Sequence, residues 1–107
     1  MSDEVSDLGR FAEPSLYILA ALGDGPRHGY AIMTEVERTS GKPLGPGTLY
    51  AALSRLEGRG LIEALDPEER RRPYRLTALG ATALEAQLRH LASFAGSALE
   101  RLVARGG

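Results

Sequence analysis

The residues best suited to bind an anion are three consecutive arginines, Arg70-Arg71-Arg72, which stand between two short apolar segments. Guanidinium groups are planar, permanently charged donors that match phosphate oxygens, so a cluster of them favours contact with a nucleic-acid backbone. The alternative is a solvated loop whose charge is balanced by Glu68 and Glu69. The stretch is too polar to be core, and we expect at least one of the three arginines to contact DNA.

A second group of polar side chains lies along residues 47–60, GTLYAALSRLEGRG. The apolar residues of this segment recur at helical spacing and form one stripe: Leu49, Ala52, Leu53 and Leu56. Hydroxyl and guanidinium groups lie off that stripe, in the half of the helix that normally enters the major groove: Thr48, Tyr50, Ser54 and Arg55. Lys42, in the preceding turn, is a candidate phosphate contact. We therefore predict that residues 47–60 form a recognition helix.

These side chains also have structural alternatives. Thr48 can cap the first free N–H groups of the helix, which follows the break at Gly45-Pro46-Gly47. Tyr50 can pack on the segment after the helix, and Arg55 can pair with Glu57 or Glu63. We expect Gly60 to supply a left-handed stop.

The overall charge is close to neutral, because 13 basic and 14 acidic residues give a net charge of -1. Its distribution is uneven. Residues 42–75 hold an excess of two basic residues, whereas residues 1–26 carry one arginine against five acidic residues. The basic excess therefore coincides with the candidate DNA contacts.

Several classes of function lack support in the sequence. The absence of cysteine excludes disulfides and thiolate metal sites and agrees with a reducing cytoplasm, and no apolar run approaches the ~20 residues of a membrane span. No nucleophile, base and orienting acid cluster, so we predict no enzyme activity and no cofactor. His28 and His90 are far apart, which predicts no metal site; we expect His28 to satisfy a backbone group. Glu35 and Glu37 are expected to form an ordinary solvated helix face.

Two helices and a hairpin surround the recognition segment in the 107-residue chain. Pro14 suits the first turn of a buried helix that ends at residues 23–26, and a short amphipathic helix is predicted from about Gly29 to Thr39, with Gly41 as its stop. Residues 61–65 and 74–76 are predicted strands of a hairpin. Helix, tight turn, helix and hairpin are the elements of a winged helix-turn-helix.

The last predicted helix runs from about Ala78 to Ala104, with Thr77 as its N-cap and a length of about 40 Å. Apolar residues along it form a heptad seam: Leu84, Leu88, Leu91, Ala95, Ala98 and Leu102. A domain of this size cannot cover so long a stripe, whereas a second copy of the same helix can. The seam therefore predicts a homodimer.

With these residues in place, the chain from about Leu16 to Leu84 resembles the PadR family of bacterial transcriptional regulators. The resemblance rests on three groups of residues: His28-Gly29-Tyr30 with Ile32; Gly47-Thr48-Leu49-Tyr50 with Leu53, Arg55-Leu56-Glu57 and Gly60-Leu61-Ile62; and Tyr74-Arg75-Leu76-Thr77 with Gly80. It implies a homodimeric winged-helix protein, usually a repressor, that dimerises through its C-terminal helix and can be released from DNA by a small molecule. The single long helix resembles the short-tailed branch.

The sequence departs from the family pattern at two positions. Ala51 follows the recognition-helix tyrosine where the family commonly has proline, and Pro73 stands where an aromatic residue is common. Neither change removes a side chain assigned to DNA. Because proline cannot donate a backbone hydrogen bond, we expect the return strand to begin at Tyr74.

We predict a mainly α protein divided into a flexible arm (1–12), a winged helix-turn-helix with three helices and a two-stranded wing (13–77), and a long C-terminal dimerisation helix (78–107). The expected function is sequence-specific transcriptional regulation in the cytoplasm, as a homodimeric repressor on a palindromic operator of double-stranded DNA. The alternative is a winged-helix protein-docking module that does not bind DNA. A small-molecule effector is expected against the last helix, near Leu16, Leu88 and Phe94.

Overall fold

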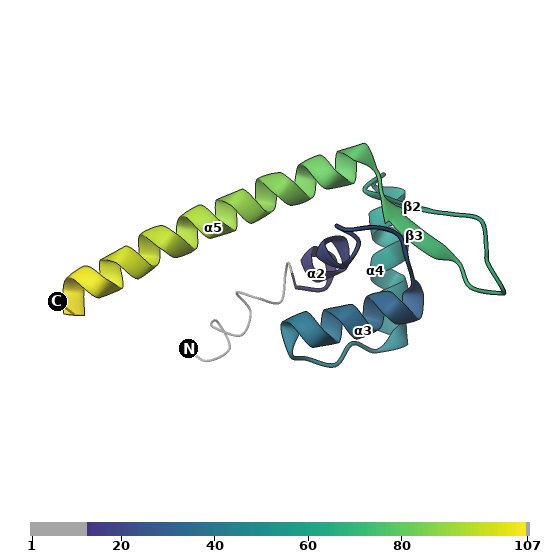
Figure 1. Ribbon diagram of the computed structural model, residues 1–107, viewed down its shortest axis with the longest axis horizontal. Coiled ribbons are helices and arrows are strands. Elements are labelled where there is room, and N and C mark those ends of the chain that lie inside the picture. Colours follow the sequence, from purple (N-terminus) through teal and green to yellow (C-terminus); the bar gives the residue numbers. More distant parts are fainter. Residues whose placement is uncertain (1–12, 107) are drawn as a thin grey trace.

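Three short helices and a small sheet pack together in residues 13–106, the part of the chain that the computed structural model describes, and one long helix extends away from them (Figure 1). The predicted arm, residues 1–12, lies outside the described residues. The elements in chain order are α2 (Glu13–Ala21), β1 (Arg27–His28), α3 (Gly29–Ser40), α4 (Pro46–Gly58), β2 (Ile62–Ala64), β3 (Pro73–Leu76) and α5 (Ala78–Gly106). The predicted winged-helix order is confirmed.

The core forms where the apolar stripes of α2, α3 and α4 meet. Its largest fully buried side chains come from these three helices, from the turn just after α2 and from β2: Ile18, Leu22, Ile32, Leu49, Leu53 and Ile62. Leu44 is buried as well and plugs the core from the turn between α3 and α4. The predicted stripe of α4 is therefore its buried face, and the remaining faces of that helix are free for other contacts.

The sheet has three antiparallel strands rather than the two that the sequence predicts. β2 pairs with β3 in the predicted hairpin, with Ile62 opposite Leu76. The other edge of β3 pairs with β1, where Arg27 lies opposite Tyr74. β3 also begins one residue earlier than predicted, because Pro73 needs only its carbonyl, which accepts a hydrogen bond of 2.8 Å from the Leu65 N–H.

Glycine and threonine end and begin the helices largely as predicted. Gly41 ends α3 in the left-handed region at φ 74°, and Gly60 has the same φ just after α4. Thr77 caps α5, since its Oγ1 accepts a hydrogen bond of 2.9 Å from the Gly80 N–H. The prediction that Thr48 caps its helix is wrong: α4 begins at Pro46 with Gly45 as N-cap, because proline at the first helical position has no N–H to satisfy.

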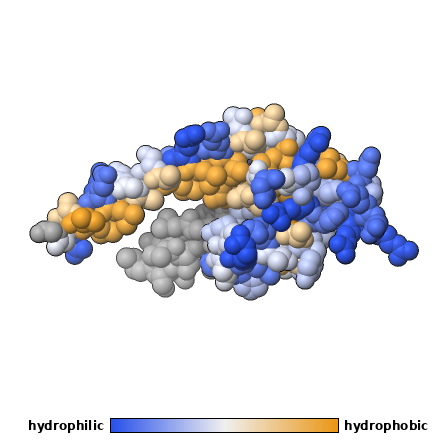
Figure 2. Space-filling view, viewed as in Figure 1, coloured by the Kyte–Doolittle hydropathy of each residue, from blue (hydrophilic) through white to orange (hydrophobic). Residues whose placement is uncertain are grey.

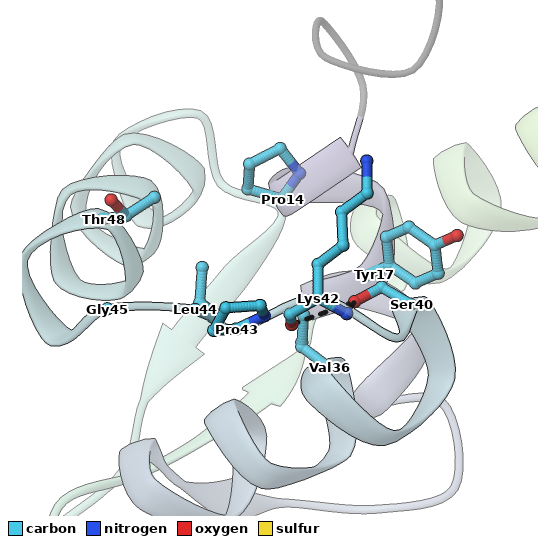
Figure 3. Close-up of a pocket in the computed structure, with 9 residues that line it drawn as sticks. All are labelled: Pro14, Tyr17, Val36, Ser40, Lys42, Pro43, Leu44, Gly45 and Thr48. Atoms are coloured by element: carbon cyan, nitrogen blue, oxygen red, sulfur yellow. Dashed lines mark hydrogen bonds between the residues drawn. The ribbon is translucent and has the colours of Figure 1, made fainter. Parts of the chain in front are cut away.

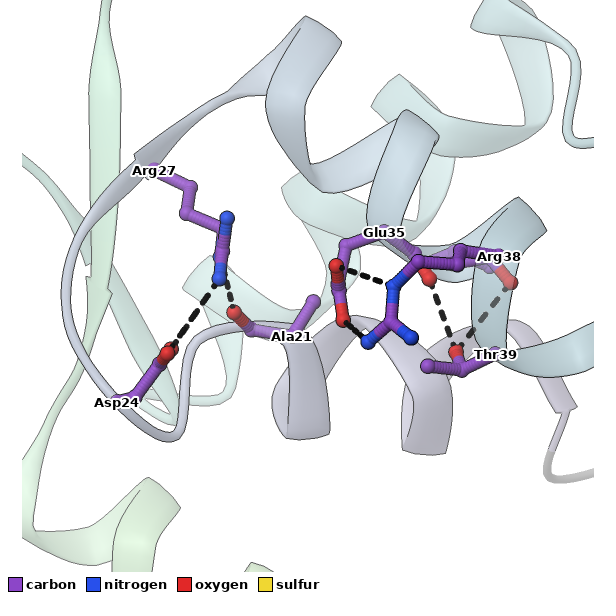
Figure 4. Close-up of polar contacts among 7 residues, drawn as sticks. Ala21, Asp24, Arg27, Glu35, Arg38 and Thr39 are labelled. Atoms are coloured by element: carbon purple, nitrogen blue, oxygen red, sulfur yellow. Dashed lines mark hydrogen bonds and ion pairs between the residues drawn. The ribbon is translucent and has the colours of Figure 1, made fainter.

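Two groups of polar contacts are drawn in Figure 4: one joins the end of α2 to β1, and the other lies on the surface of α3. Arg27 Nε donates to the Ala21 carbonyl at 2.7 Å, and its guanidinium pairs with Asp24, which ties β1 to the end of α2. Glu35 pairs with Arg38 one turn later, and the Arg38 hydrogen bond lowers the pKa of the Glu35 carboxyl. The Arg38 side chain is mostly exposed, so this pair adds little to stability.

The start of α5 is fixed to the chain that leaves α4. Thr77 Oγ1 donates to the Gly60 carbonyl at 2.6 Å, and the Thr77 N–H donates to the Leu61 carbonyl at 3.2 Å. A Cβ on Gly80 would lie 1.8 Å from that Leu61 oxygen. We call these residues the α4–α5 junction (Gly60, Leu61, Thr77 and Gly80). Only glycine allows the first turn of α5 to approach so closely.

None of the described helices has the combined length and apolarity needed to cross a membrane.

We predict that Gly80→Ala lowers the free energy of unfolding by about 3 kcal/mol, because its methyl group meets backbone that cannot swing aside. Gly96→Ala is the matched control on the same helix, since its Cβ would meet nothing within 4 Å. The control should gain about 0.5–1 kcal/mol from lost backbone freedom. Urea unfolding at one protein concentration measures both, and equal stabilities would contradict the close approach.

Candidate nucleic-acid interface

The exposed face of α4 carries the predicted recognition residues. Thr48, Tyr50, Ser54 and Arg55 are all exposed, while the apolar stripe behind them is buried. Glu63 pairs with Arg75 rather than with Arg55. Within residues 13–106 Arg55 forms no ion pair, so its guanidinium is available to an external anion.

The turn before α4 is held by Glu37, whose role the sequence did not indicate. Its Oε2 accepts a hydrogen bond of 2.8 Å from the Leu44 N–H, so the prediction of an ordinary solvated carboxylate is wrong for this residue. The spacing of charged residues on α3 does not reveal a hydrogen bond to a backbone N–H seven residues further along the chain. The contact fixes the angle between α3 and α4 and thereby the exposed face of α4.

Lys42 and Thr48 line a small hollow beside this turn, closed on the other side by Pro14 and Tyr17 of α2 (Figure 3). The hollow has a volume of about 170 Å³. The backbone N–H of Lys42 donates to Ser40 Oγ at 3.1 Å, which holds the turn. Lys42 is exposed, on the same connection that leads into α4.

The wing hairpin ends in a tight turn that places the arginines in solvent. Glu68 and Arg71 form an antiparallel bridge, and between them Glu69 and Arg70 have φ values of 48° and 70°. Two positive φ values in a two-residue loop describe a type I′ turn, which normally prefers asparagine and glycine. The hydrophilic end of the molecule in Figure 2 contains this hairpin.

The three wing arginines are exposed and differ in their partners. Arg72 Nη1 donates to the Leu65 carbonyl at 3.2 Å. Arg70 and Arg71 have no ion pair within the described part of the chain, so Glu68 and Glu69 do not neutralise them by direct contact.

Tyr50 connects α4 to the start of α3. Its hydroxyl lies so close to Gly29 that a Cβ at residue 29 would be 2.5 Å from it, and its side chain is 52% exposed. His28, beside Gly29, does not satisfy a backbone group as predicted, because its buried Nδ1 has no hydrogen-bond partner among the described residues. These contacts join residues about 20 positions apart, which sequence spacing cannot reveal.

Tyr74 lies beside this group on β3. Burial raises the pKa of its phenol, and the Glu57 carboxylate and Tyr50 raise it further, against an opposing effect of Arg72. The phenol therefore keeps its proton at neutral pH. Tyr74 can act as a hydrogen-bond donor there.

The predicted dimerisation residues mostly form an exposed apolar stripe along α5, visible as the apolar band in Figure 2. Leu88 and Leu91 are 44% and 37% exposed, and Phe94 and Leu102 are more exposed still. Leu84 differs, because it is 7% exposed and belongs to the chain's own core. Its assignment to the dimer seam is corrected: the exposed stripe begins at Leu88.

The three residues predicted near an effector are not gathered around one cavity in the single chain. Leu88 lines an apolar hollow with Leu76 and Leu84, Phe94 lines a separate one with Leu102, and Leu16 packs against the core. Within residues 13–106, no group of three metal-ligating side chains lies close enough to hold a metal ion.

The family model of the "Transcriptional regulator PadR-like family" matches residues 18–86, which include the core, the recognition helix, the wing and the α4–α5 junction. The chain belongs to the PadR-like family. This family consists of transcriptional regulators rather than enzymes, in agreement with the sequence-based prediction.

Solved structures of the family share the fold. A PadR family regulator from Eggerthella lenta is 33% identical, with a TM-score of 0.66 over 92% of this chain and 91% of that one. A PadR family regulator from Clostridium difficile is 26% identical, with a TM-score of 0.71 over 84% of this chain and 97% of that one. The chain is also 43% identical over 88% of its length to a 37.1 kDa protein in transposon TN4556 of Streptomyces fradiae, of which it spans only 27%.

The type I′ turn predicts opposite stability effects at two adjacent arginines. Arg70→Gly should raise the free energy of unfolding by about 1 kcal/mol, because glycine adopts positive φ without the steric cost that arginine bears. Arg71→Gly removes the same charge where φ is ordinary, and it should lower stability slightly. Thermal unfolding compares the two variants, and equal shifts would argue against the turn.

Proposed function

We propose that this chain is a sequence-specific, DNA-binding transcriptional regulator that acts as a homodimeric repressor on a palindromic operator. One observation carries the proposal: the exposed cationic and hydroxyl groups of α4 and the wing stand apart from the exposed apolar stripe of α5. One surface therefore suits a polyanion and the other an apolar partner. Membership of a family of transcriptional regulators supports the same reading.

The DNA contacts divide into two kinds. Thr48, Tyr50, Ser54 and Arg55 lie on the exposed face of α4 and read base edges or phosphates in the major groove. The three wing arginines and Lys42 bind backbone phosphates and supply affinity that does not depend on sequence. Neutral overall charge does not oppose this function, because affinity depends on the local field at the binding surface.

The dimer contacts lie on α5. Its exposed stripe places large side chains on both sides of two small ones: Leu88 and Leu91, then Ala95 and Ala98, then Leu102. Burying such a stripe against a second copy removes apolar surface from water at about 25 cal/mol per Å². The dimer presents two copies of α4, and each reads one half-site of a palindrome.

Regulation follows from the same helix. An apolar small molecule bound against α5, at the hollow beside Leu88 or at the one beside Phe94, would change how the two α5 helices pack and so release DNA. Leu16, which packs against the core, is the third residue expected near such a molecule. In this arrangement residues 13–77 bind DNA and residues 78–107 dimerise. Such a repressor acts in the cytoplasm, where it meets its operator.

Selection of bound duplexes from a random pool tests the proposal most directly. The expected result is a palindrome whose half-sites lie about one helical turn apart. A salt titration of binding to random duplex distinguishes this function from the alternative, a winged-helix protein-docking module. A protein-docking module would show no salt-dependent DNA binding, and that outcome would overturn the proposal.

Replacing the wing arginines tests the phosphate contacts. Arg70, Arg71 and Arg72 changed together to Ala should weaken operator and random duplex alike and should flatten the salt dependence by about one unit of slope per lost contact. Fluorescence anisotropy over a series of salt concentrations measures both affinities. If slope and affinities are unchanged, the wing does not lie on DNA.

Charging the exposed stripe tests the dimer. Leu88→Asp with Leu91→Asp should give monomers, since truncating a buried leucine costs about 2–5 kcal/mol and a two-fold interface meets each change twice. Operator affinity should then fall towards that of random duplex, because the gain from binding two half-sites is lost. Sedimentation and operator titration make the two measurements.

Ala86→Asp with Ser93→Asp adds the same charge at exposed positions on the opposite side of α5 and serves as the control. It should remain dimeric and bind the operator as the unmodified protein does. A stable dimer of the Leu88→Asp, Leu91→Asp variant would mean that copies associate through another surface. A monomer that binds the palindrome with full affinity would rule out paired half-sites.

A further inference from the structure

A cleft of about 450 Å³ lies between the wing and the start of α3. Hydrogen-bond donors from three elements line it: Tyr30, Tyr50, Tyr74, Arg70, Arg71 and Arg72. No carboxylate lies among the described residues that form its wall. Three guanidinium groups can only donate hydrogen bonds and the phenols can also donate, so the cleft suits a ligand rich in acceptors and negative charge.

Gly29 determines where the Tyr50 hydroxyl lies in this cleft. A Cβ at residue 29 would be 2.5 Å from Tyr50 Oη and 3.1 Å from Cζ, so the end of the ring rests on the glycine. Gly29 itself is buried, whereas Tyr50 is about half exposed. The tyrosine therefore reaches the cleft because the first residue of α3 has no side chain.

His28 adds an unpaired group to the same wall. Its Nδ1 is buried and has no hydrogen-bond partner among the described residues, although His28 lines the cleft. A buried polar atom without a partner costs about 1–3 kcal/mol, and such atoms are rare in folded proteins. Because Nδ1 is buried, it does not face a ligand directly, and the groups that line the cleft as donors are the phenols and guanidinium groups.

The ligand is identified by what flanks the cleft. Its lining includes Tyr50 from α4, whose exposed face carries the proposed base contacts, and the three wing arginines. Figure 1 shows the wing hairpin, which follows β2, projecting beyond α4. A base edge presents donors and acceptors together, whereas a backbone phosphate presents acceptors and a negative charge. Only the phosphate matches a wall of donors.

We propose that this cleft seats one phosphate of the DNA backbone in each half-site, with Tyr50 Oη as a donor to it and Gly29 as the residue that positions Tyr50. The inference rests on the proposed DNA binding and adds a defined site to it. Tyr30 and Tyr74 supply further phenol donors, and Arg70 to Arg72 supply the opposing charge. The phosphate fixes the register of α4 against the duplex, so that the exposed face of α4 meets the same bases each time.

Gly29→Ala is the first test. The new methyl group displaces the Tyr50 ring, which can swing outward because it is half exposed, so the melting temperature should stay within a few degrees of the original. Operator affinity should fall about tenfold, the size expected for one hydrogen bond to a charged group. Gly58→Ala, whose Cβ would meet nothing within 4 Å, is the control and should change affinity less than about twofold.

Tyr50→Phe keeps the ring and removes the hydroxyl, and it serves if Gly29→Ala folds poorly. The double variant should bind no more weakly than Gly29→Ala alone, because both changes remove the same hydrogen bond. If the two losses of affinity add in full, Gly29 does not act through Tyr50 and its positioning role is overturned.

Duplexes with one neutral methylphosphonate at a time locate the phosphate. For the unmodified protein one position in each half-site should weaken binding strongly, and at that position alone the penalty should largely vanish in Gly29→Ala and in Tyr50→Phe. If the variants leave the whole pattern of penalties unchanged, the cleft holds no backbone phosphate although DNA binding stands. The same unchanged pattern together with binding of free inorganic phosphate at the cleft would assign it to a free anion instead. Absence of binding to any unmodified duplex, even at low salt, would overturn the proposed function itself.

Discussion

The α4–α5 junction is the contact on which the rest of the structure depends. Gly80 approaches the Leu61 carbonyl so closely that no Cβ fits between them, and Thr77 hydrogen-bonds to the carbonyls of Gly60 and Leu61 while capping α5. The segment that leaves α4 is thus hydrogen-bonded to the start of α5, and the Leu61 N–H, which donates to the Leu56 carbonyl at 3.0 Å, ties the same segment back to α4. The wing strand β3 enters this unit directly, because Thr77 follows Leu76. The proposed DNA-binding surface and the proposed dimerisation surface are connected here.

Much of this fold follows from signals that act within a few residues, and those parts are predictable from sequence. Gly41, Gly60 and Thr77 act through their own backbone or side chain and set the helix ends regardless of what packs nearby. β1 could not be predicted, because Arg27 and His28 have no strand pattern of their own and pair only where β3 offers an open edge. The error over Thr48 has a similar origin: two local signals competed, and proline at the first helical position prevailed.

In the candidate interface too, features set by local sequence could be predicted, whereas contacts between distant residues could not. The exposed residues of α4 and the wing could be predicted, since a side chain off the apolar stripe must face outward. The residues that hold them in place could not. Glu37 reaches the Leu44 N–H across a turn, and Gly29 lies beneath Tyr50 from another helix. Leu84 shows the converse case, because the heptad pattern of α5 continues into the chain's own core. Residue spacing alone does not distinguish an apolar residue that packs within the chain from one that remains exposed.

Because α5 is long and is fixed near its start, a small rotation at the α4–α5 junction moves its far end by a large distance. Its 29 residues span about 43 Å, whereas the contacts that fix its first turn extend over only a few ångströms. A tilt of about 5° at the α4–α5 junction would displace the far end of α5 by roughly 4 Å, which is most of the ~5.4 Å pitch of an α-helix. In the proposed dimer, a small change in the angle at which the two α5 helices cross would likewise change the distance between the two copies of α4. In that dimer, Gly80 and Thr77, which fix the direction in which α5 leaves the junction, would set how far a change at the apolar stripe alters the distance between the two copies of α4.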